Sequence, residues 1–588
     1  MDQVLERLRQ RKIVQWALAY LAAAFALIQM FDLVAQRFGW PAGVERALMI
    51  AAAVGFVVTL VLAWYHGERG AQRISGGELL ILALLLLIGG GLLWRLSGVP
   101  DEGARSAASS ASTTSPAVDA QKPSAPPDGK SIAVLPLANT SGDPANEYFS
   151  DGLSEELISV LARIPDLKII GRNSSFHFKN TGDDSRTIGE RLGVANLLEG
   201  SVRKQGERVR IAVDLITAAD GRQLWSETYD RELKDIFAVQ SEIAAAVVAQ
   251  LKVKLLGGQN RVAPNPNIAA YNALLEGQHL LPKFNESDQR KAAAYFEQAT
   301  ELDPEYALAY TQLSRAWRSL GASFFGEEAE MNDAYQRARE AAQKALKLAP
   351  DLSEAHSAYG YVLLTPDLDF ISAEVEFRRA VELAPGSARA TDGLAYLLAV
   401  QGRLAEAEAM SRQAIVLDPL WVSPYLNVAR IQMGSDRLDE AEANVRKAID
   451  LQHDVSHAYA YLTLIDLKRN DNAAAMRDAA LEPEGFWHDF ATTLALQRQG
   501  DRAAADAALK SLADANHYGG PFQVAIVYAL RKEPDRMFEW LDRSWQVRDS
   551  GLTQLLVTPF LLDYRDDPRF AALAAKMKLD PAMVKRRP

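Results

Sequence analysis

The segment from Lys130 to Leu157, KSIAVLPLANTSGDPANEYFSDGLSEEL, joins a short apolar run to an acidic helix through a polar loop. Strand, polar loop and helix in this order form phosphate sites and many active sites. The tripeptide Gly129-Lys130-Ser131 also matches the end of a Walker A motif, whose lysine binds nucleotide phosphates. The first hypothesis for this segment is therefore a nucleotide-binding or catalytic site.

The details of the segment argue against that hypothesis. A Walker A motif has a glycine five residues before Gly129, where this chain has Ser124, and Lys130 precedes the apolar run instead of following it. The loop contains no histidine or lysine that could work with its acids in proton transfer. Carboxylates at a helix N-terminus are favoured by capping and by the helix dipole, and they would repel a phosphate; those of the segment are Asp143, Glu147, Asp151, Glu155 and Glu156. We therefore expect the loop to be structural.

The rest of the sequence offers little chemistry. The chain has no cysteine, which excludes disulfides, thiolate zinc sites and cysteine nucleophiles. His453 and His457 are four residues apart but straddle an expected inter-helix turn, so they do not form a helical metal pair. We predict no catalytic residue, no cofactor site and no metal site. The alternative, an enzyme or nucleotide-binding protein with its site in the α/β segment, requires an acid, a base and a nucleophile that converge in one cleft.

The length and net charge of the chain indicate which kinds of molecule it can bind. At 588 residues the chain is long enough for several domains. A net charge of −11 and a pI near 5.4 argue against a nucleic-acid partner, because no basic surface dominates. The expected partners are therefore proteins and a membrane.

Residues 1–96 have the pattern of a membrane domain with three transmembrane helices. The apolar segments Ile13–Val34, Ala47–Tyr65 and Leu79–Trp94 are each close to the ~20 residues that a spanning helix needs. Lysines and arginines favour the cytoplasmic side. Six lysines and arginines lie on the side of the membrane that holds the N-terminus: Arg7, Arg9, Arg11, Lys12, Arg69 and Arg73. Four lie on the opposite side: Arg37, Arg46, Arg95 and Arg105. We therefore predict a bacterial inner-membrane protein whose C-terminal domains are periplasmic.

Residues 97–129 are rich in Ser, Ala, Pro and Thr and predict a flexible linker. Residues 130–258 then alternate between strand and helix patterns, in the order β-α-β-α-β-β-β-α. The two hairpins of the last three strands turn at Gly206 and at Asp220-Gly221. The helices are expected at Glu147–Ile164, Ser185–Leu192 and Asp235–Leu255. This order predicts a mixed sheet covered by helices.

Two stretches of this segment are familiar: SIAVLPLANTSGDPANEYFSDGLSEELISVLARIPDLKIIGRNSSFHFK and LGVANLLEGSVRKQGERVRIAVDLITAADGRQLWSETYDREL. They closely resemble the bacterial TolB amino-terminal domain and the related FlgO-type domain. The upstream AYLAAAFALIQMFDLV looks like the membrane helix that precedes this module in large TPR-containing membrane proteins. The resemblance implies a non-enzymatic binding or scaffolding module. Such relatives can carry an amino-terminal adenylate cyclase or winged-helix domain; because twelve residues precede Ile13, we expect no such effector here.

Residues 264–588 repeat. The related motifs ELDPEYALAY, KLAPDLSEAH, ELAPGSARAT, VLDPLWVSPY and DLQHDVSHAY recur at a step of about 34 residues, the tetratricopeptide (TPR) period. Small residues keep the same step, at Ala292, Ala338, Ala373, Ala407, Ala441 and Ala475, and at Ala299, Ala345, Ala380, Ala414 and Ala448. The first interval is longer, which predicts an insertion around SLGASFFGEEAE. Helix pairs are also expected at Gly485–Ala515 and Pro521–Val547, with a closing helix at Asp567–Met577. The whole chain is therefore predicted to be mainly α: three transmembrane helices, a mixed α/β domain and a TPR α-solenoid.

The first helix of each TPR pair lines the concave surface, which usually binds a peptide. The ninth position of each first helix is occupied by Arg315, Tyr361, Tyr396, Arg430 or Leu464, and Arg318 lies near Arg315. Tyrosine and arginine are enriched at binding hot spots. Partner-binding candidates are therefore Arg315, Arg318, Tyr361, Tyr396 and Arg430; the alternative is that the tyrosines pack between repeats. The sequence thus favours a non-enzymatic, membrane-anchored scaffold or sensor that holds a protein or peptide in the TPR groove.

Overall fold

The computed structural model describes residues 128–251, 267–283, 285–323, 328–515 and 520–585, which belong to one compact unit. The three expected membrane spans and most of the linker fall in residues 1–127, outside the described residues. Among the described helices, none combines the length and the hydropathy that a membrane crossing needs. The described part is mainly helical, with one small mixed sheet and a C-terminal helical repeat, as the sequence predicts.

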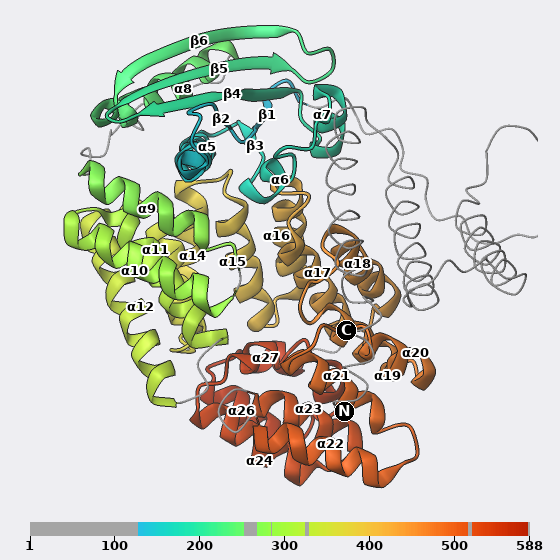
Figure 1. The fold of residues 1–588 in the computed structure, drawn as a ribbon. Coiled ribbons are helices and arrows are strands. Elements are labelled where there is room, and N and C mark those ends of the chain that lie inside the picture. Colours follow the sequence, from blue (N-terminus) through green and yellow to red (C-terminus); the bar gives the residue numbers. More distant parts are fainter. Residues whose placement is uncertain (1–127, 252–266, 284, 324–327, 516–519, 586–588) are drawn as a thin grey trace, which may run out of the picture. The chain divides into compact units, whose positions relative to one another are not determined.

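The α/β domain is built on a sheet with the strand order β3-β1-β4-β5-β6. The strand β1 pairs in parallel with β3 and β4, whereas β4, β5 and β6 form two antiparallel hairpins. Figure 1 shows the three long strands side by side. The strands are β1 Ser131–Val134, β2 Ala138–Asn139, β3 Lys168–Ile169, β4 Asn196–Gln205, β5 Arg208–Thr217 and β6 Gln223–Glu232, with β2 beside β4. Gly206 and Gly221 turn the hairpins with positive φ angles, 58° and 66°, which glycine adopts without strain.

Alternation along β1 sends its side chains to opposite faces of the sheet. Ile132 and Val134 pack with α5 (Glu147–Ala162) and α8 (Ile236–Gln250) on one face. Ala133 packs with α7 (Ser185–Leu192) on the other. The predicted helices are thus confirmed within the described residues. One α-helix of this domain was not predicted, the five-residue helix α6, Arg172–Phe176.

The helical repeat stacks helices that follow one another closely in the chain (Figure 1). Short turns between successive helices make them antiparallel pairs. The pairs are α9 Ile268–Leu280 with α10 Glu286–Leu302, α11 Ala307–Ser323 with α12 Glu328–Leu348, α13 Ser353–Leu364 with α14 Phe370–Leu383, α15 Ala388–Val400 with α16 Leu404–Leu417, α17 Val422–Gly434 with α18 Leu438–Leu451, α19 Ala458–Lys468 with α20 Asn472–Ala479, α21 Phe486–Leu496 with α22 Arg502–Ala515, and α23 Pro521–Arg531 with α24 Pro534–Gln546.

The repeated alanines explain the tight stacking. All of those that keep the repeat step are completely buried. A small side chain there lets the backbones of neighbouring helices approach, so each pair can bury its apolar face against the next. The insertion predicted in the first interval lengthens one pair, because α11 has 17 residues and α12 has 21, against 12 and 14 in the next pair.

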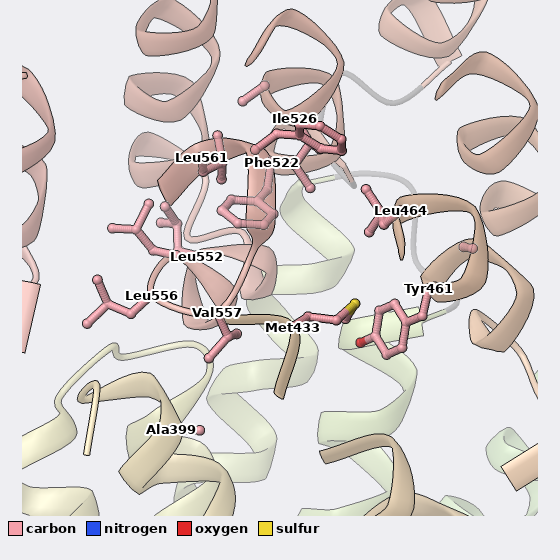
Figure 2. Close-up of a cluster of buried hydrophobic side chains, with 14 of the residues drawn as sticks. Ala399, Met433, Tyr461, Leu464, Phe522, Ile526, Leu552, Leu556, Val557 and Leu561 are labelled. Atoms are coloured by element: carbon pink, nitrogen blue, oxygen red, sulfur yellow. The ribbon is translucent and has the colours of Figure 1, made fainter. Parts of the chain in front are cut away.

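The C-terminal segment 550–562 crosses the first helices of several pairs. It contains the 3₁₀ helix η3 (Ser550–Gln554) and α25 (Pro559–Leu562). Figure 2 shows Leu552, Leu556, Val557 and Leu561 among side chains of α15, α17, α19 and α23. This part of the expected concave face is therefore filled by the chain itself, which no sequence pattern predicts. Two short helices, α26 (Pro568–Lys576) and α27 (Pro581–Lys585), follow.

Candidate binding site

The α/β domain is fastened to the repeat by Asp418, at the C-terminal end of α16. Its carboxylate, which is 2% exposed, accepts hydrogen bonds from the Ser174 amide (2.7 Å), from the Ser174 hydroxyl and from Asn173 Nδ2 (2.8 Å). Burial raises the pKa of Asp418, although these hydrogen bonds oppose that shift. Because donors of α6 satisfy this carboxylate, α6 and the turn before α17 form one buried, hydrogen-bonded junction.

Backbone contacts complete the junction. The Gly171 amide donates to the Leu417 carbonyl (2.7 Å), and the Gly386 amide donates to the Ala162 carbonyl (3.0 Å). A Cβ at Gly171 would lie 2.5 Å from Asp418 Oδ2, so this position tolerates only glycine without movement. Together these contacts hold α5 and α6 over the first helices of the repeat.

A cavity of ≈ 290 Å³ lies beneath this junction, between α5 and α6 on one side and α11, α13, α15 and α17 on the other. We call it the arginine cavity, because four arginines line it: Arg172, Arg315, Arg318 and Arg389. Only Arg172 has an ion-pair partner among the described residues, Glu155 at 2.7 Å. The cavity therefore brings together guanidinium groups from both domains.

The other three arginines of the cavity contact neutral groups. Arg315 Nη1 donates to Gln312 Oε1 (3.1 Å). Arg318 lies over the ring of Tyr361 at 5.0 Å, and Arg389 lies over Trp421 at 5.6 Å. Burial, and next the charge of Arg389, lower the pKa of Arg315 well below its usual range. An arginine stays protonated in proteins, so an anion placed between these buried guanidinium groups would offset their desolvation and their mutual repulsion.

Four acids line the cavity, and two of them are paired with arginines: Glu155 with Arg172 and Glu354 with Arg163. Asp392 accepts hydrogen bonds from Asn427 (2.7 Å) and Ser423 (3.0 Å), and burial raises its pKa to about 6. Glu354 pairs with Arg163 of α5 at 3.3 Å. Asp392 and Asp418 are hydrogen-bonded only to neutral groups and keep their charge, so three arginines without an ion pair face two such carboxylates. The remaining charge of the cavity is therefore positive by one unit.

The five predicted partner-binding residues divide into two groups. Arg315, Arg318 and Tyr361 line the arginine cavity, and Tyr361 also packs edge-on against Phe377, with ring centroids 4.9 Å apart. Tyr396 and Arg430 lie at the C-terminal segment instead. The Tyr396 hydroxyl is 2.7 Å from Thr553 Oγ1, and Arg430, which is 3% exposed, stacks on the Tyr396 ring at 4.3 Å. Their role in partner binding stays a prediction.

Sequence reasoning missed two arginines of the cavity. Arg389 occupies the second position of α15, whereas the predicted binding residues lie at or near the ninth position of each first helix. Arg172 belongs to the α/β domain and reaches the cavity only because the domains dock. The repeat pattern gives Arg389 a defined position on a first helix, but no local sequence signal marks Arg172.

The acidic segment that opens α5 is held by structural contacts. Asp143 accepts a hydrogen bond from the Ala145 amide (2.9 Å), and Lys179 pairs with Glu147 (2.6 Å) and Asp151 (2.5 Å). Burial alone would raise the pKa of Asp151, but hydrogen bonds from His279 and Lys179 outweigh it, and the pKa is lowered. Among the described residues, no group of three or more His, Cys, Asp or Glu side chains is placed to hold a metal ion.

Comparison with known proteins gives one sequence relative and several distant structural likenesses. No family model matches the chain. It is 40% identical over 204 residues to "Putative adenylate cyclase 3" of Rhizobium meliloti (strain 1021), a stretch that is 34% of this chain and 34% of that protein. The chain thus spans about a third of that relative's length. The resemblance of the α/β segment to TolB and FlgO-type domains stays a prediction.

Among solved structures, the chain resembles PilW, a type IV pilus biogenesis factor (TM-score 0.31, 21% identity, 36% of this chain and 92% of that chain). It also resembles YrrB, a TPR protein with an unusual peptide-binding site (0.23, 21%, 34% and 92%), and human IFIT1 with m7Gppp-AAAA (0.34, 13%, 53% and 77%). These TM-scores correspond to distant likenesses only. The TPR-type repeat rests on the chain's own helix pairs and period.

Proposed function

We propose that this chain is a membrane-anchored, non-enzymatic interaction protein that binds an acidic segment of a protein partner in the arginine cavity. The observation that carries the proposal is the set of three arginines, Arg315, Arg318 and Arg389, that face one cavity without a carboxylate partner among the described residues. A carboxylate binds a guanidinium through two parallel hydrogen bonds, which gives both affinity and orientation.

The size of the cavity limits what part of the partner enters. A volume of ≈ 290 Å³ accepts a few side chains or a chain end, not a long extended peptide. The concave surface beyond α15 is occupied by residues 550–562 (Figure 2). The partner is therefore expected to insert a short acidic stretch, with Tyr361 as an aromatic contact beside Arg318.

Replacing Arg315 and Arg318 together with glutamine should weaken the binding of an acidic peptide more than tenfold. Each hydrogen bond to a charged group contributes about 1.5–3 kcal/mol. The measurement is fluorescence anisotropy of labelled acetyl-Glu-Tyr-Glu-Glu with the full chain in detergent. The same peptide with glutamine for each glutamate reports the charge requirement.

Arg208→Gln is the matched control, because Arg208 is exposed on the β4–β5 hairpin and pairs with Asp230 at 2.9 Å, away from the cavity. Equal affinity of the double variant and the wild type, with unchanged melting temperatures, would contradict the proposal. Saturable ATP binding that Lys130→Ala abolishes would instead support the alternative of a nucleotide site in the α/β domain.

The membrane anchor and its orientation are proposed from residues 1–96. Three apolar segments of spanning length and six cytoplasmic-side cations against four support a periplasmic location for residues 130–588. Alkaline phosphatase fused after Gly129 should be active, and a fluorescent protein fused at the same point should stay dark. The reverse pattern would place both domains in the cytoplasm.

A further inference from the structure

A second cavity, of ≈ 410 Å³, lies where α5, α8 and α9 meet the start of α11 and the end of α12. We call it the polar cavity. It shares wall residues with the arginine cavity, among them Glu155 and Gln312. Its apolar lining includes Val160, Phe237 and Leu352, so it offers a ligand both apolar walls and polar groups.

Four buried polar atoms of this lining have no hydrogen-bond partner among the described residues. They are Glu156 Oε1, Gln278 Oε1, Tyr306 OH and Arg163 Nε. The side chains of Glu156 and Gln278 are only 7% and 6% exposed. An unsatisfied buried group costs about 1–3 kcal/mol, so such groups are rare. Four around one cavity indicate a surface built to bind a polar ligand.

Hydrogen bonds from two neighbouring helices fix the orientation of the Glu156 side chain. Its Oε2 accepts hydrogen bonds from the Tyr271 hydroxyl (3.1 Å) and from Gln240 Nε2. Tyr271 is 1% exposed and belongs to α9, whereas Gln240 belongs to α8. One carboxylate oxygen is thus held by two helices, and the other is left for a ligand.

The charges of the polar cavity favour a cation. The acidic side chains of Glu156, Asp303 and Glu305 line it, and its arginine, Arg163, already pairs with Glu354 at 3.3 Å. An ammonium group beside Glu156 would favour the ionised form of this carboxyl, which burial alone disfavours. The Tyr306 hydroxyl, which has no hydrogen-bond partner among the described residues, can donate a hydrogen bond to an acceptor on a ligand. We infer that the polar cavity is a binding site for a small organic amine that gives an ammonium group to Glu156 and a hydrogen-bond acceptor to Tyr306. This inference does not rest on the proposed partner site.

The test uses three molecules of one length: 5-aminopentan-1-ol, the neutral pentane-1,5-diol and the anionic 5-hydroxypentanoate. Isothermal titration calorimetry with the full chain in detergent should show the amine binding at least tenfold more tightly than either of the others. Glu156→Gln keeps the size of the side chain and should remove this preference. Glu190→Gln, at an exposed position of α7, should leave it unchanged.

Tyr306→Phe provides a second variant if Glu156→Gln does not fold. It should abolish the advantage of 5-aminopentan-1-ol over pentylamine, because only the hydroxyl contact is lost. The inference is overturned if the amine binds no better than the diol, or if Glu156→Gln binds it as well as the wild type does.

Discussion

Replacement of Asp418 with alanine is expected to uncouple the unfolding of the α/β domain from that of the helical repeat. The change removes one carboxylate and leaves the Ser174 amide, the Ser174 hydroxyl and Asn173 Nδ2 without their acceptor. Buried donors that lose a charged partner cost about 1–3 kcal/mol each, so the junction should weaken by about 3 kcal/mol or more. Differential scanning calorimetry should show two transitions for the variant and one for the wild type.

Asp351→Ala is the matched control for this experiment. Asp351 lies in the turn between α12 and α13 and pairs with Arg379 at 3.2 Å, but its side chain is 69% exposed. Exposed ion pairs contribute about 0–1 kcal/mol, so this variant should melt as the wild type does. A single unshifted transition for Asp418→Ala would show that the remaining backbone contacts carry the junction alone.

Glu156→Gln is expected to stabilise the protein at alkaline pH and to change little at acid pH. Burial raises the pKa of Glu156 to about 7 from an ordinary 4.5, so the folded state favours the protonated acid. The resulting stabilisation is complete below about pH 4.5 and is lost as the pH rises through about 7. Glutamine cannot ionise, so the variant should gain about 3 kcal/mol over the wild type by pH 8.

The measurement is urea unfolding of both proteins at pH 5 to 8, and the difference between them is compared at each pH. Tyr271, Tyr306, Glu155 and Arg163 influence Glu156 and remain the same in both proteins. Other buried acids, such as Asp392, contribute equally to the unfolding free energy of both proteins, so their pH dependence cancels in the difference. Parallel curves across this range would mean that the folded state does not favour the protonated carboxyl.

Local sequence patterns could predict most elements of the fold. The hairpins follow from alternating apolar residues around Gly206 and Gly221, and the helix pairs follow from alanines at a constant step. Both signals act between residues that are near in the chain or repeated along it. The segment 550–562 carries no such period, because its apolar residues are placed to fit helices far away in sequence.

The docking of the two domains also depends on residues far apart in the sequence, so local patterns could not predict it. Asp303 and Asp418 stand in the same Leu-Asp-Pro motif of the repeat. Asp303 accepts hydrogen bonds from the Asn267 and Glu305 amides, whereas Asp418 is satisfied by α6 of the other domain. Identical local sequence thus has two roles, which only the three-dimensional arrangement decides. The repeat pattern could predict Arg315 and Tyr361 as binding residues. It could not predict Arg172 and Glu156, which belong to the other domain.

The crossing of residues 550–562 has a consequence for how the protein is made. An ordinary solenoid can fold unit by unit as it leaves the ribosome, because each unit touches only its neighbours. Here the first helices from α15 onward pack apolar side chains against residues 552–561. Tyr396 of α15 also hydrogen-bonds to Thr553, 157 residues later in the chain. Nascent or truncated chains that stop before Leu552 therefore expose an apolar surface, which chaperones and proteases can recognise. Synthesis of residues 550–562 thus completes the apolar packing of the preceding helix pairs.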